Sequence, residues 1–317
     1  MNQTIAALIV KRIALTLLIL LIVSMIIFTI TNLLPGDAAQ EALGQAATPE
    51  TIAALRLQFG LDQPAYLRYL HWLAGLVRGD FGMSLSASLP VSEMIAGRLP
   101  KSLELAAITT LVSVPIAISM GILAAVKRGS LLDRMISLST LALVATPEFL
   151  IATFAVLVFA VKLHWLSALS YSGEIDSFEH FMRAYAMPVI TLCCVIIAQM
   201  ARMTRAAVIE QLGSSYVEMA ILKGARPARV VLLHALPNAI GPIANAVALS
   251  LSYLLGGVIV VETIYIYPGL ARLMVDAVSN RDMPLVQACT LIFCLGYLIL
   301  VLLADLCAIV SNPRLRT

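Results

Sequence analysis

The stretch IALTLLILLIVSMIIFTITNLL, residues 13–34, decides the class of fold, because it holds no charged residue along its whole length. Lys11 and Arg12 precede it. A helix needs about 20 apolar residues to cross the hydrocarbon core of a bilayer. The stretch is too long for the apolar core of a secretory signal peptide, and no small-x-small cleavage site follows it cleanly. We therefore expect residues 1–34 to form a retained transmembrane helix.

The composition of the rest of the chain agrees with a membrane protein. Of the 317 residues, 61% are hydrophobic and 12% are charged, and the mean hydropathy is +0.96. Soluble domains are about half apolar and about a quarter charged, and they rarely expose large apolar patches. We expect an all-α integral membrane protein with about six transmembrane helices. The five later apolar runs cover about residues 103–126, 135–163, 187–203, 240–261 and 286–310.

The charges between the apolar runs predict the orientation of the chain. With a cytoplasmic N-terminus, the inside segments hold 12 Lys and Arg against three acidic residues, a net charge of +9. The outside segments hold nine basic and thirteen acidic residues, a net charge of −4. Because cytoplasmic loops carry an excess of Lys and Arg, both termini should be cytoplasmic. Residues 35–100 would then form an external domain, and residues 101–317 a core of five spans.

The motifs of common catalytic sites do not occur in the sequence. There is no GxxxxGK[ST] phosphate-binding loop, no HExxH zinc motif and no GxSxG nucleophile motif. The four histidines are scattered over predicted loops, and the five cysteines sit in apolar runs without a CxxC pair. We therefore expect no catalytic residue, metal site or cofactor in this chain. The energy for uphill transport would come from a partner or from an ion gradient.

Two ionisable residues fall within the apolar runs, where each is costly in lipid. Glu148 follows Pro147 in the third run, and the proline should kink that helix. Glu148 could line a cavity in a translocation path or make a structural hydrogen bond near the kink. Asp305 lies near the end of the last run, where an ion pair with Arg314 or another interfacial base is expected. A proton-coupled carrier usually needs more ionisable residues within the membrane than these two. Their small number disfavours an ion-coupled secondary transporter, which stays as the alternative function.

The segment SYVEMAILKGARPARV, residues 215–230, lies between the fourth and fifth runs. It predicts a short helix, a stop at Gly224 and a second helix opened by Pro227. Ala220 and Gly224 are small and four residues apart, so a partner backbone could approach closely. This segment is either a docking surface or an ordinary solvated connection. An apolar knob for docking would be made by Val217, Ile221 and Leu222.

The same segment resembles the EAA loop of ATP-binding cassette (ABC) importer permeases, with Glu218, Met219 and Ala220 at its start and Gly224 four residues later. Met219, Leu222 and Ala225 depart from the commoner residues. Further motifs, in order along nearly the whole chain, resemble the B-type permease subunit of dipeptide, oligopeptide and nickel importers. They are Leu34-Pro35-Gly36-Asp37, Phe59-Gly60-Leu61-Asp62-Gln63-Pro64, Arg78-Gly79-Asp80-Phe81-Gly82, Arg98-Leu99-Pro100-Lys101-Ser102-Leu103-Glu104-Leu105-Ala106, Arg202-Met203-Thr204-Arg205, Leu236-Pro237, Val261-Glu262-Thr263-Ile264, Tyr267-Pro268-Gly269-Leu270, Arg281-Asp282-Met283-Pro284 and Asn312-Pro313-Arg314-Leu315-Arg316.

The resemblance implies a type I importer permease fold in a bacterial inner membrane. A second, related permease would complete the path, two cytoplasmic ATPases would bind and hydrolyse ATP, and a periplasmic or lipid-anchored solute-binding protein would deliver cargo. No nucleic acid partner is implied. The solute would be a di- or oligopeptide, a nickel chelate or a glutathione-like molecule. The coupling loop would span residues 205–236, and its contacts with the ATPases would come from Glu218, Ala220, Ile221, Leu222, Gly224 and Arg226.

Overall fold

The computed structural model describes residues 3–33, 48–58, 62–170, 173 and 175–311. Regular structure in these ranges is helical, apart from one isolated bridge between Met83 and Pro90. The prediction of an all-α fold is therefore confirmed. Parts of three motifs fall outside the described residues: Leu34-Pro35-Gly36-Asp37, Phe59-Gly60-Leu61, and Asn312 to Arg316 with Arg314.

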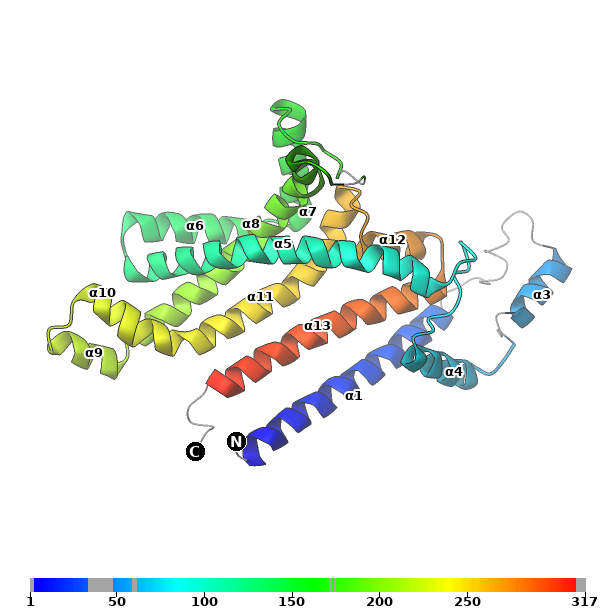
Figure 1. The fold of residues 1–317 in the computed structure, drawn as a ribbon, viewed down its shortest axis with the longest axis horizontal. Coiled ribbons are helices and arrows are strands. Elements are labelled where there is room, and N and C mark those ends of the chain that lie inside the picture. The colour runs from blue at the N-terminus through cyan, green and yellow to red at the C-terminus, as the bar shows by residue number, and fades with distance from the viewer. Residues whose placement is uncertain (1–2, 34–47, 59–61, 171–172, 174, 312–317) are drawn as a thin grey trace. The chain divides into compact units, whose positions relative to one another are not determined.

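Figure 1 shows the order of the helices along the chain. They are α1 (Gln3–Leu33), α3 (Pro49–Gln58), α4 (Ala65–Arg78), α5 (Val91–Val126), α6 (Leu131–Ala145), α7 (Glu148–Ala155), the π-helical η2 (Val156–Lys162), α8 (Phe178–Leu212), α9 (Ser215–Leu222), α10 (Pro227–Arg229), the π-helical η3 (Val230–Ala235), α11 (Leu236–Ile264), α12 (Leu270–Ser279) and α13 (Met283–Ser311).

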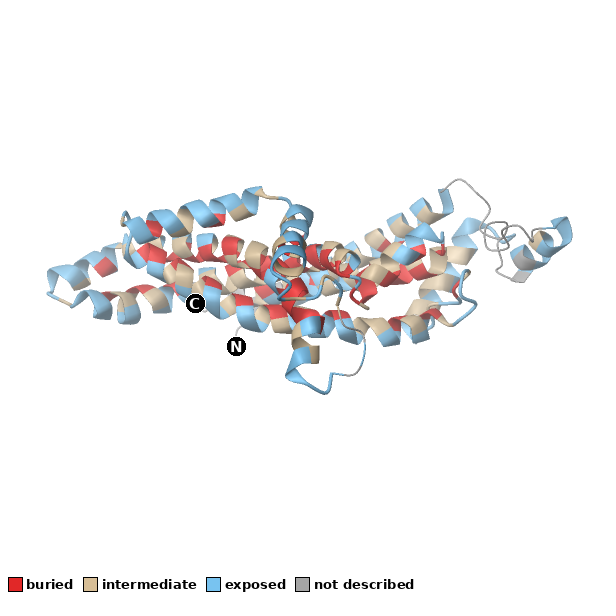
Figure 2. Ribbon diagram, turned by 90° about the horizontal axis from the view of Figure 1, so that it is seen from above, coloured by how far each residue is buried: buried red, intermediate tan, exposed pale blue. Residues whose placement is uncertain are grey.

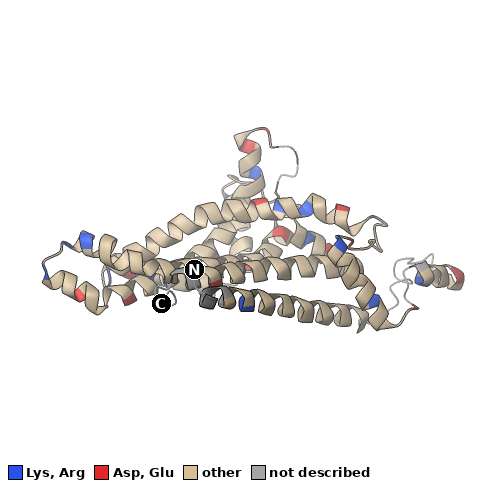
Figure 3. Cartoon of the chain, turned by 60° about the horizontal axis from the view of Figure 1, so that its bottom comes forward, with Lys and Arg blue, Asp and Glu red and all other residues tan. Residues whose placement is uncertain are grey.

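Within the described residues, five helical stretches are long and apolar enough to cross a membrane, and a sharply bent pair makes six if it counts as one span. The number agrees with the prediction of about six. The stretches are Ile9–Leu33, Val91–Val126, Phe178–Leu212, Pro227–Ile264 and Met283–Leu306, and the bent pair is Leu131–Ala145 with Glu148–Lys162. In Figure 3 long helical stretches carry no charged residue. Exposed residues cover many helix surfaces in Figure 2, and they include large apolar side chains such as Leu111, Leu138 and Phe154. Lipid would cover such surfaces.

The predicted kink at Pro147 is a complete break between two helices. α6 ends at Ala145 and α7 begins at Glu148, with a bend of 103° between the pair. Thr146 has φ −93° and ψ 127°, which is extended backbone. Proline disfavours the helical conformation of the residue before it and offers no N–H to continue the helical hydrogen bonds. The position of the bend was predicted. The bend is sharper than the kink expected inside a continuous helix, because Thr146 and Pro147 both leave the helical conformation.

Contacts divide the chain into two compact units. The first holds Met1–Ala14, Glu104–Tyr267 and Tyr297–Thr317, and the second holds Leu15–Leu103 and Pro268–Gly296. This division follows packing. The domains predicted from the sequence were defined instead by the side of the membrane on which each segment would lie. They cover residues 1–34, 35–100 and 101–317, and they stay a prediction.

In the first unit α8 is the central helix, packed against α6, α7 and α11. In its most apolar window 61% of the residues are buried, against 33% in the stretch that contains α11. α5 approaches α8 at Gly121, where an added Cβ would lie 2.7 Å from the Ala201 carbonyl oxygen and from the Thr204 Cβ. A larger residue at 121 would therefore push α5 away from α8.

In the second unit a buried carboxylate joins segments far apart in the sequence. Asp282 is fully buried just before α13, and its carboxylate accepts hydrogen bonds from the hydroxyls of Ser84 and Ser86. The backbone N–H groups of Leu85 and Ser86 donate to the same carboxylate. These neutral donors satisfy a charge that would otherwise be costly to bury. The loop before α5 is thereby fixed to the start of α13.

Candidate functional site

The predicted coupling loop folds as a short helix, a glycine stop and a second helical start. α9 covers Ser215–Leu222, and Pro227 opens α10, which continues through η3 into α11. Gly224 has φ +77°, as its predicted role after a helix end requires. Its N–H donates to the Ile221 carbonyl at 2.9 Å, and the Ala225 N–H donates to the Ala220 carbonyl at 3.1 Å. These two bonds form a Schellman motif, which turns the chain tightly at the end of α9.

The loop has a small apolar core of its own. Val217, Val230 and Ala235 are buried together, and Leu212 and Ala225 pack against them. Val217 is therefore part of this core and not of the predicted apolar knob, since the first turn of α9 points it inward against η3. The loop is held on α8 as well, because the Tyr216 hydroxyl donates to the Gln211 side-chain carbonyl at 2.7 Å.

The outward side of α9 is apolar at its C-terminal end. Leu222 is 74% exposed and Ile221 is 56% exposed, and Met219 beside them is 53% exposed. We call these three residues the α9 edge. Glu218 is exposed in the first turn of α9, where the helix dipole favours a negative charge. Ala220 is half-buried, and Arg226 is exposed before α10.

An ion pair that the sequence reasoning missed fixes α6 to α8 near the loop. Arg205 donates from Nε to Asp133 Oδ1 at 2.7 Å and from Nη2 to Oδ2 at 3.0 Å. Asp133 is 4% exposed, and it also accepts from the Gly129 N–H and the Ser137 hydroxyl. Bidentate arginine–carboxylate pairs of this kind are among the stronger polar contacts in proteins. A local signal was present, because Ser130 and Asp133 have the spacing of a helix N-terminus, but nothing local pointed to Arg205.

The expected ion pair of Asp305 is present with another base. Asp305 Oδ2 on α13 lies 2.8 Å from Arg12 Nη1 on α1. Both side chains keep partial exposure, so the pair stabilises the fold only modestly. Arg314, the other expected partner, lies outside the described residues. This pair argues for a structural role of Asp305.

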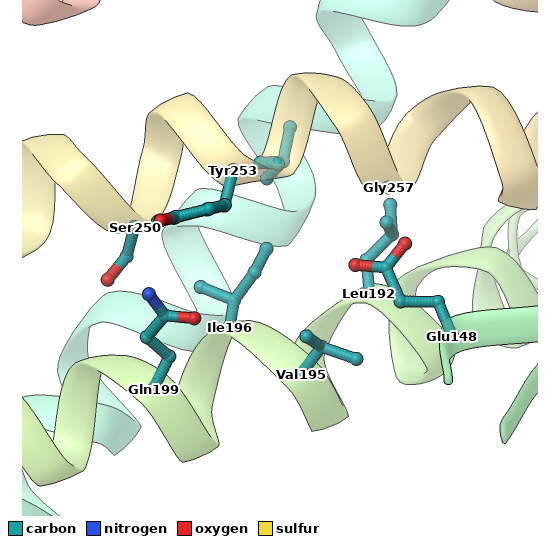
Figure 4. A pocket seen from close by; sticks show the side chains of 9 residues that line it. Glu148, Leu192, Val195, Ile196, Gln199, Ser250, Tyr253 and Gly257 are labelled. Carbon is teal, nitrogen blue, oxygen red and sulfur yellow. The ribbon is translucent and has the colours of Figure 1, made fainter. Parts of the chain in front are cut away.

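Glu148 faces a narrow recess between α7, α8 and α11 (Figure 4). A Cβ added to Gly257 would lie 3.0 and 3.2 Å from the two carboxylate oxygens, so the glycine makes room for Glu148. Gln199 and Ser250 line the same recess, and the Ser250 hydroxyl is buried without a hydrogen-bond partner in the described chain. The recess is small: the volume that the centre of a water molecule can occupy there is about 10 Å³. It therefore has room for about one water molecule. The recess alone therefore holds no solute of peptide size.

A second, wider recess of about 620 Å³ opens between α6 and α8. Ser137, Leu141 and Val144 line it from α6, and the α8 residues that line it are Gln199, Arg202, Met203 and Arg205. Gln199 borders both recesses, so they adjoin along α8. The sequence reasoning missed Gln199, Ser250 and Gly257, because each is an ordinary residue in an apolar run.

Among the described residues, no group of three or more His, Cys, Asp or Glu is placed to hold a metal ion. The described cysteines Cys193, Cys194, Cys289 and Cys294 form no disulfide. The side chain of Cys307 lies outside the described residues.

Comparison with known families decides the identity. Residues 117–317 match the family described as the binding-protein-dependent transport system inner membrane component, and residues 5–106 match the N-terminal family of the same membrane component. The chain belongs to this family of ABC importer permeases. The predicted resemblance to ABC importer permeases is thereby confirmed, as is the placement in a bacterial inner membrane.

Individual permeases resemble this one over nearly their whole lengths. A probable peptide ABC transporter permease of Sinorhizobium fredii is 33% identical over 97% of this chain and 98% of its own. A putative peptide transport system permease of Brucella abortus is 37% identical over 98% and 99%. The glutathione transport system permease of Escherichia coli strain K12 is 36% identical over 97% and 98%. A permease of this family has a transport role and, in general, works with ATPase and solute-binding partners.

Proposed function

We propose that this permease forms half of the path by which peptides, or a similar small solute, enter a bacterial cell through an ATP-driven importer. The observation that carries the proposal is the full-length similarity to permeases named for peptide and glutathione transport. A second, related permease would complete the path. The two recesses support this, since the one at Glu148 is too small for a peptide and the wider one beside it is open, so that another subunit would close the path.

Two cytoplasmic ATPases would dock at the coupling loop. Support comes from the α9 edge, which leaves three large apolar side chains exposed beside a sharp turn at Gly224. Glu218, Ala220 and Arg226 would border this contact. ATP would be bound by the ATPases, and this chain would hold no cofactor. Movement of the ATPases would tilt α9, and the ion pair between Asp133 and Arg205 would carry that movement to α6 and α8.

A solute-binding protein, periplasmic or lipid-anchored, would deliver cargo to the external segment at 35–100. Pro147 and Glu148 would lie on the translocation path, at the break between α6 and α7. Peptides and glutathione are favoured over nickel chelates by the names of the similar permeases.

A tagged form of this chain, co-expressed with the genes beside its own, tests the proposal. A second permease and the ATPases should co-purify with the tagged chain. Vesicles holding the complex should take up a labelled di- or tetrapeptide when ATP and the binding protein are added. A decrease in this uptake on adding excess glutathione, or a nickel–histidine chelate, would show that the added molecule is also cargo. Purification of the chain alone, with no ATP-dependent peptide uptake, would contradict the proposal. Gradient-driven uptake by the chain alone would favour a secondary transporter.

A further inference from the structure

We propose that Glu148, Gln199 and Arg202 form a polar track that binds the two charged ends of a zwitterionic solute, such as an unblocked peptide. Glu148 would receive the ammonium end and Arg202 the carboxylate end. The inference rests on the proposed transport function and assigns residues of the path beyond Pro147 and Glu148.

The track follows one face of α8. Leu192 lies beside Glu148 and Gly257, and Val195, Gln199 and Arg202 follow at spacings of three, four and three residues. Residues at these spacings lie on the same face of a helix. Figure 4 shows Leu192, Val195 and Gln199 along α8, with Glu148 at one end. The face lies between α6 and α11, where both recesses open.

The side chains of the track have unused hydrogen-bonding capacity. In the described part of the chain neither Glu148 nor Arg202 takes part in an ion pair, whereas the neighbouring Arg205 is paired with Asp133. Arg202 is exposed in the wider recess. Between the two ends the Ser250 hydroxyl is 1% exposed and has no partner among the described residues. A buried hydroxyl and a charge within an apolar span are both costly without a ligand.

The two charges stand at a spacing that suits an extended peptide. Ten residues separate Leu192, beside Glu148, from Arg202, which corresponds to about 15 Å along the helix axis. An extended chain advances about 3.3–3.6 Å per residue, so a peptide of about four or five residues would reach both charges at once. A dipeptide would contact the two ends in turn. Gln199, with one donor and one acceptor group, would serve the peptide bonds between them.

Uptake by the whole importer tests the charge recognition. Arg202→Gln should lower ATP-dependent uptake of tetra-alanine at least about tenfold, the loss of one charge-assisted contact, and leave uptake of its C-terminal amide unchanged. Glu148→Gln should lower uptake of tetra-alanine in the same way and leave N-acetyl-tetra-alanine unchanged. Each rate is compared with the wild type for the same peptide, so the preference of the binding protein cancels. Arg134→Gln, an exposed base on α6 outside both recesses, is the matched control.

Equal losses for free and blocked peptides would overturn the inference, because they would indicate contact with the second permease or a folding role. Unchanged uptake of tetra-alanine in both variants would overturn it too. Absence of ATP-dependent uptake in the wild type would instead count against the proposed function.

Thiol labelling tests the track without any transport. Gln199→Cys should react with a water-soluble maleimide, and saturating tetra-alanine should slow the reaction. Ile190 lies nine residues earlier, on the opposite face of α8, and is 37% exposed, so Ile190→Cys should face lipid and react slowly. Rates are measured against the parent chain, which has its own cysteines. A Gln199→Cys rate no faster than that of Ile190→Cys would overturn the inference.

Discussion

Among single residues, Gly224 shows which requirements come from the fold of this chain and which would come from a docked protein. Its backbone is left-handed at φ +77°, and an added Cβ would meet nothing within 4 Å in this chain. The chain itself therefore requires glycine only for its backbone conformation, and another residue there would cost about 1–2 kcal/mol. A larger requirement would have to come from a protein docked on the α9 edge.

Gly224→Asp should leave the protein inserted but lower ATP-dependent uptake at least about tenfold, because a carboxylate would enter a close contact with an ATPase. Gly79→Asp is the matched control. Gly79 ends α4 with φ +80° and has the same open space around its Cβ position, but it lies in the predicted external segment. Its uptake should stay near wild type. Intact uptake by Gly224→Asp, at normal expression, would contradict docking at this turn.

At the scale of the element, the ion pair between Asp133 and Arg205 ties the start of α6 to α8. Removing one partner leaves a charge that is partly buried, since the Arg205 side chain is 30% exposed. Asp133→Asn should cost about 2 kcal/mol of stability, less than the roughly 3–5 kcal/mol for a fully buried pair because of that exposure. The melting temperature of the purified complex in detergent would measure the loss.

The double variant Asp133→Asn with Arg205→Gln shows whether the two side chains act as a pair. It should be no less stable than Asp133→Asn alone, because the unpaired charge is gone. Simple addition of the two single losses would mean that each residue acts through other contacts.

The break between α6 and α7 depends on more than Pro147. α7 packs against both α8 and α11, and those contacts remain when the proline is replaced. Pro147→Ala should therefore keep the bend and change uptake by less than about threefold, equivalent to about 0.7 kcal/mol. Spin labels at the exposed positions Leu138 and Phe149 would report the distance across the bend. A lengthened distance together with lost uptake would show that proline alone holds the break.

At the scale of the whole molecule, local patterns predicted the helical class, the number of spans and the turn at Gly224. They predicted helix ends less well. α5 begins at Val91 and α8 covers Phe178–Leu212, whereas the apolar runs begin near residues 103 and 187. An apolar window detects the part of a helix that suits lipid, and the helix continues into more polar sequence because its backbone hydrogen bonds do not require apolar side chains.

Contacts between distant segments were beyond such patterns. Asp133 and Arg205 are 72 residues apart, and Asp282 lies nearly 200 residues after the serines that hold it. Each of these side chains is ordinary in its local sequence, and only the packing of the helices brings the partners together. The same holds for Gln199 and Ser250. They became candidate site residues only because the packing of three helices places both in one recess.

The energy source of uptake distinguishes a subunit of an ATP-driven importer from an ion-coupled secondary transporter. Vesicles holding the complete complex, with the binding protein present, would be given a labelled peptide and either ATP or an imposed proton or sodium gradient. ATP alone should drive uptake, and the gradient alone should not. Uptake driven by the gradient without ATP, above all by vesicles holding only this chain, would contradict the assignment as a subunit of an ATP-driven importer.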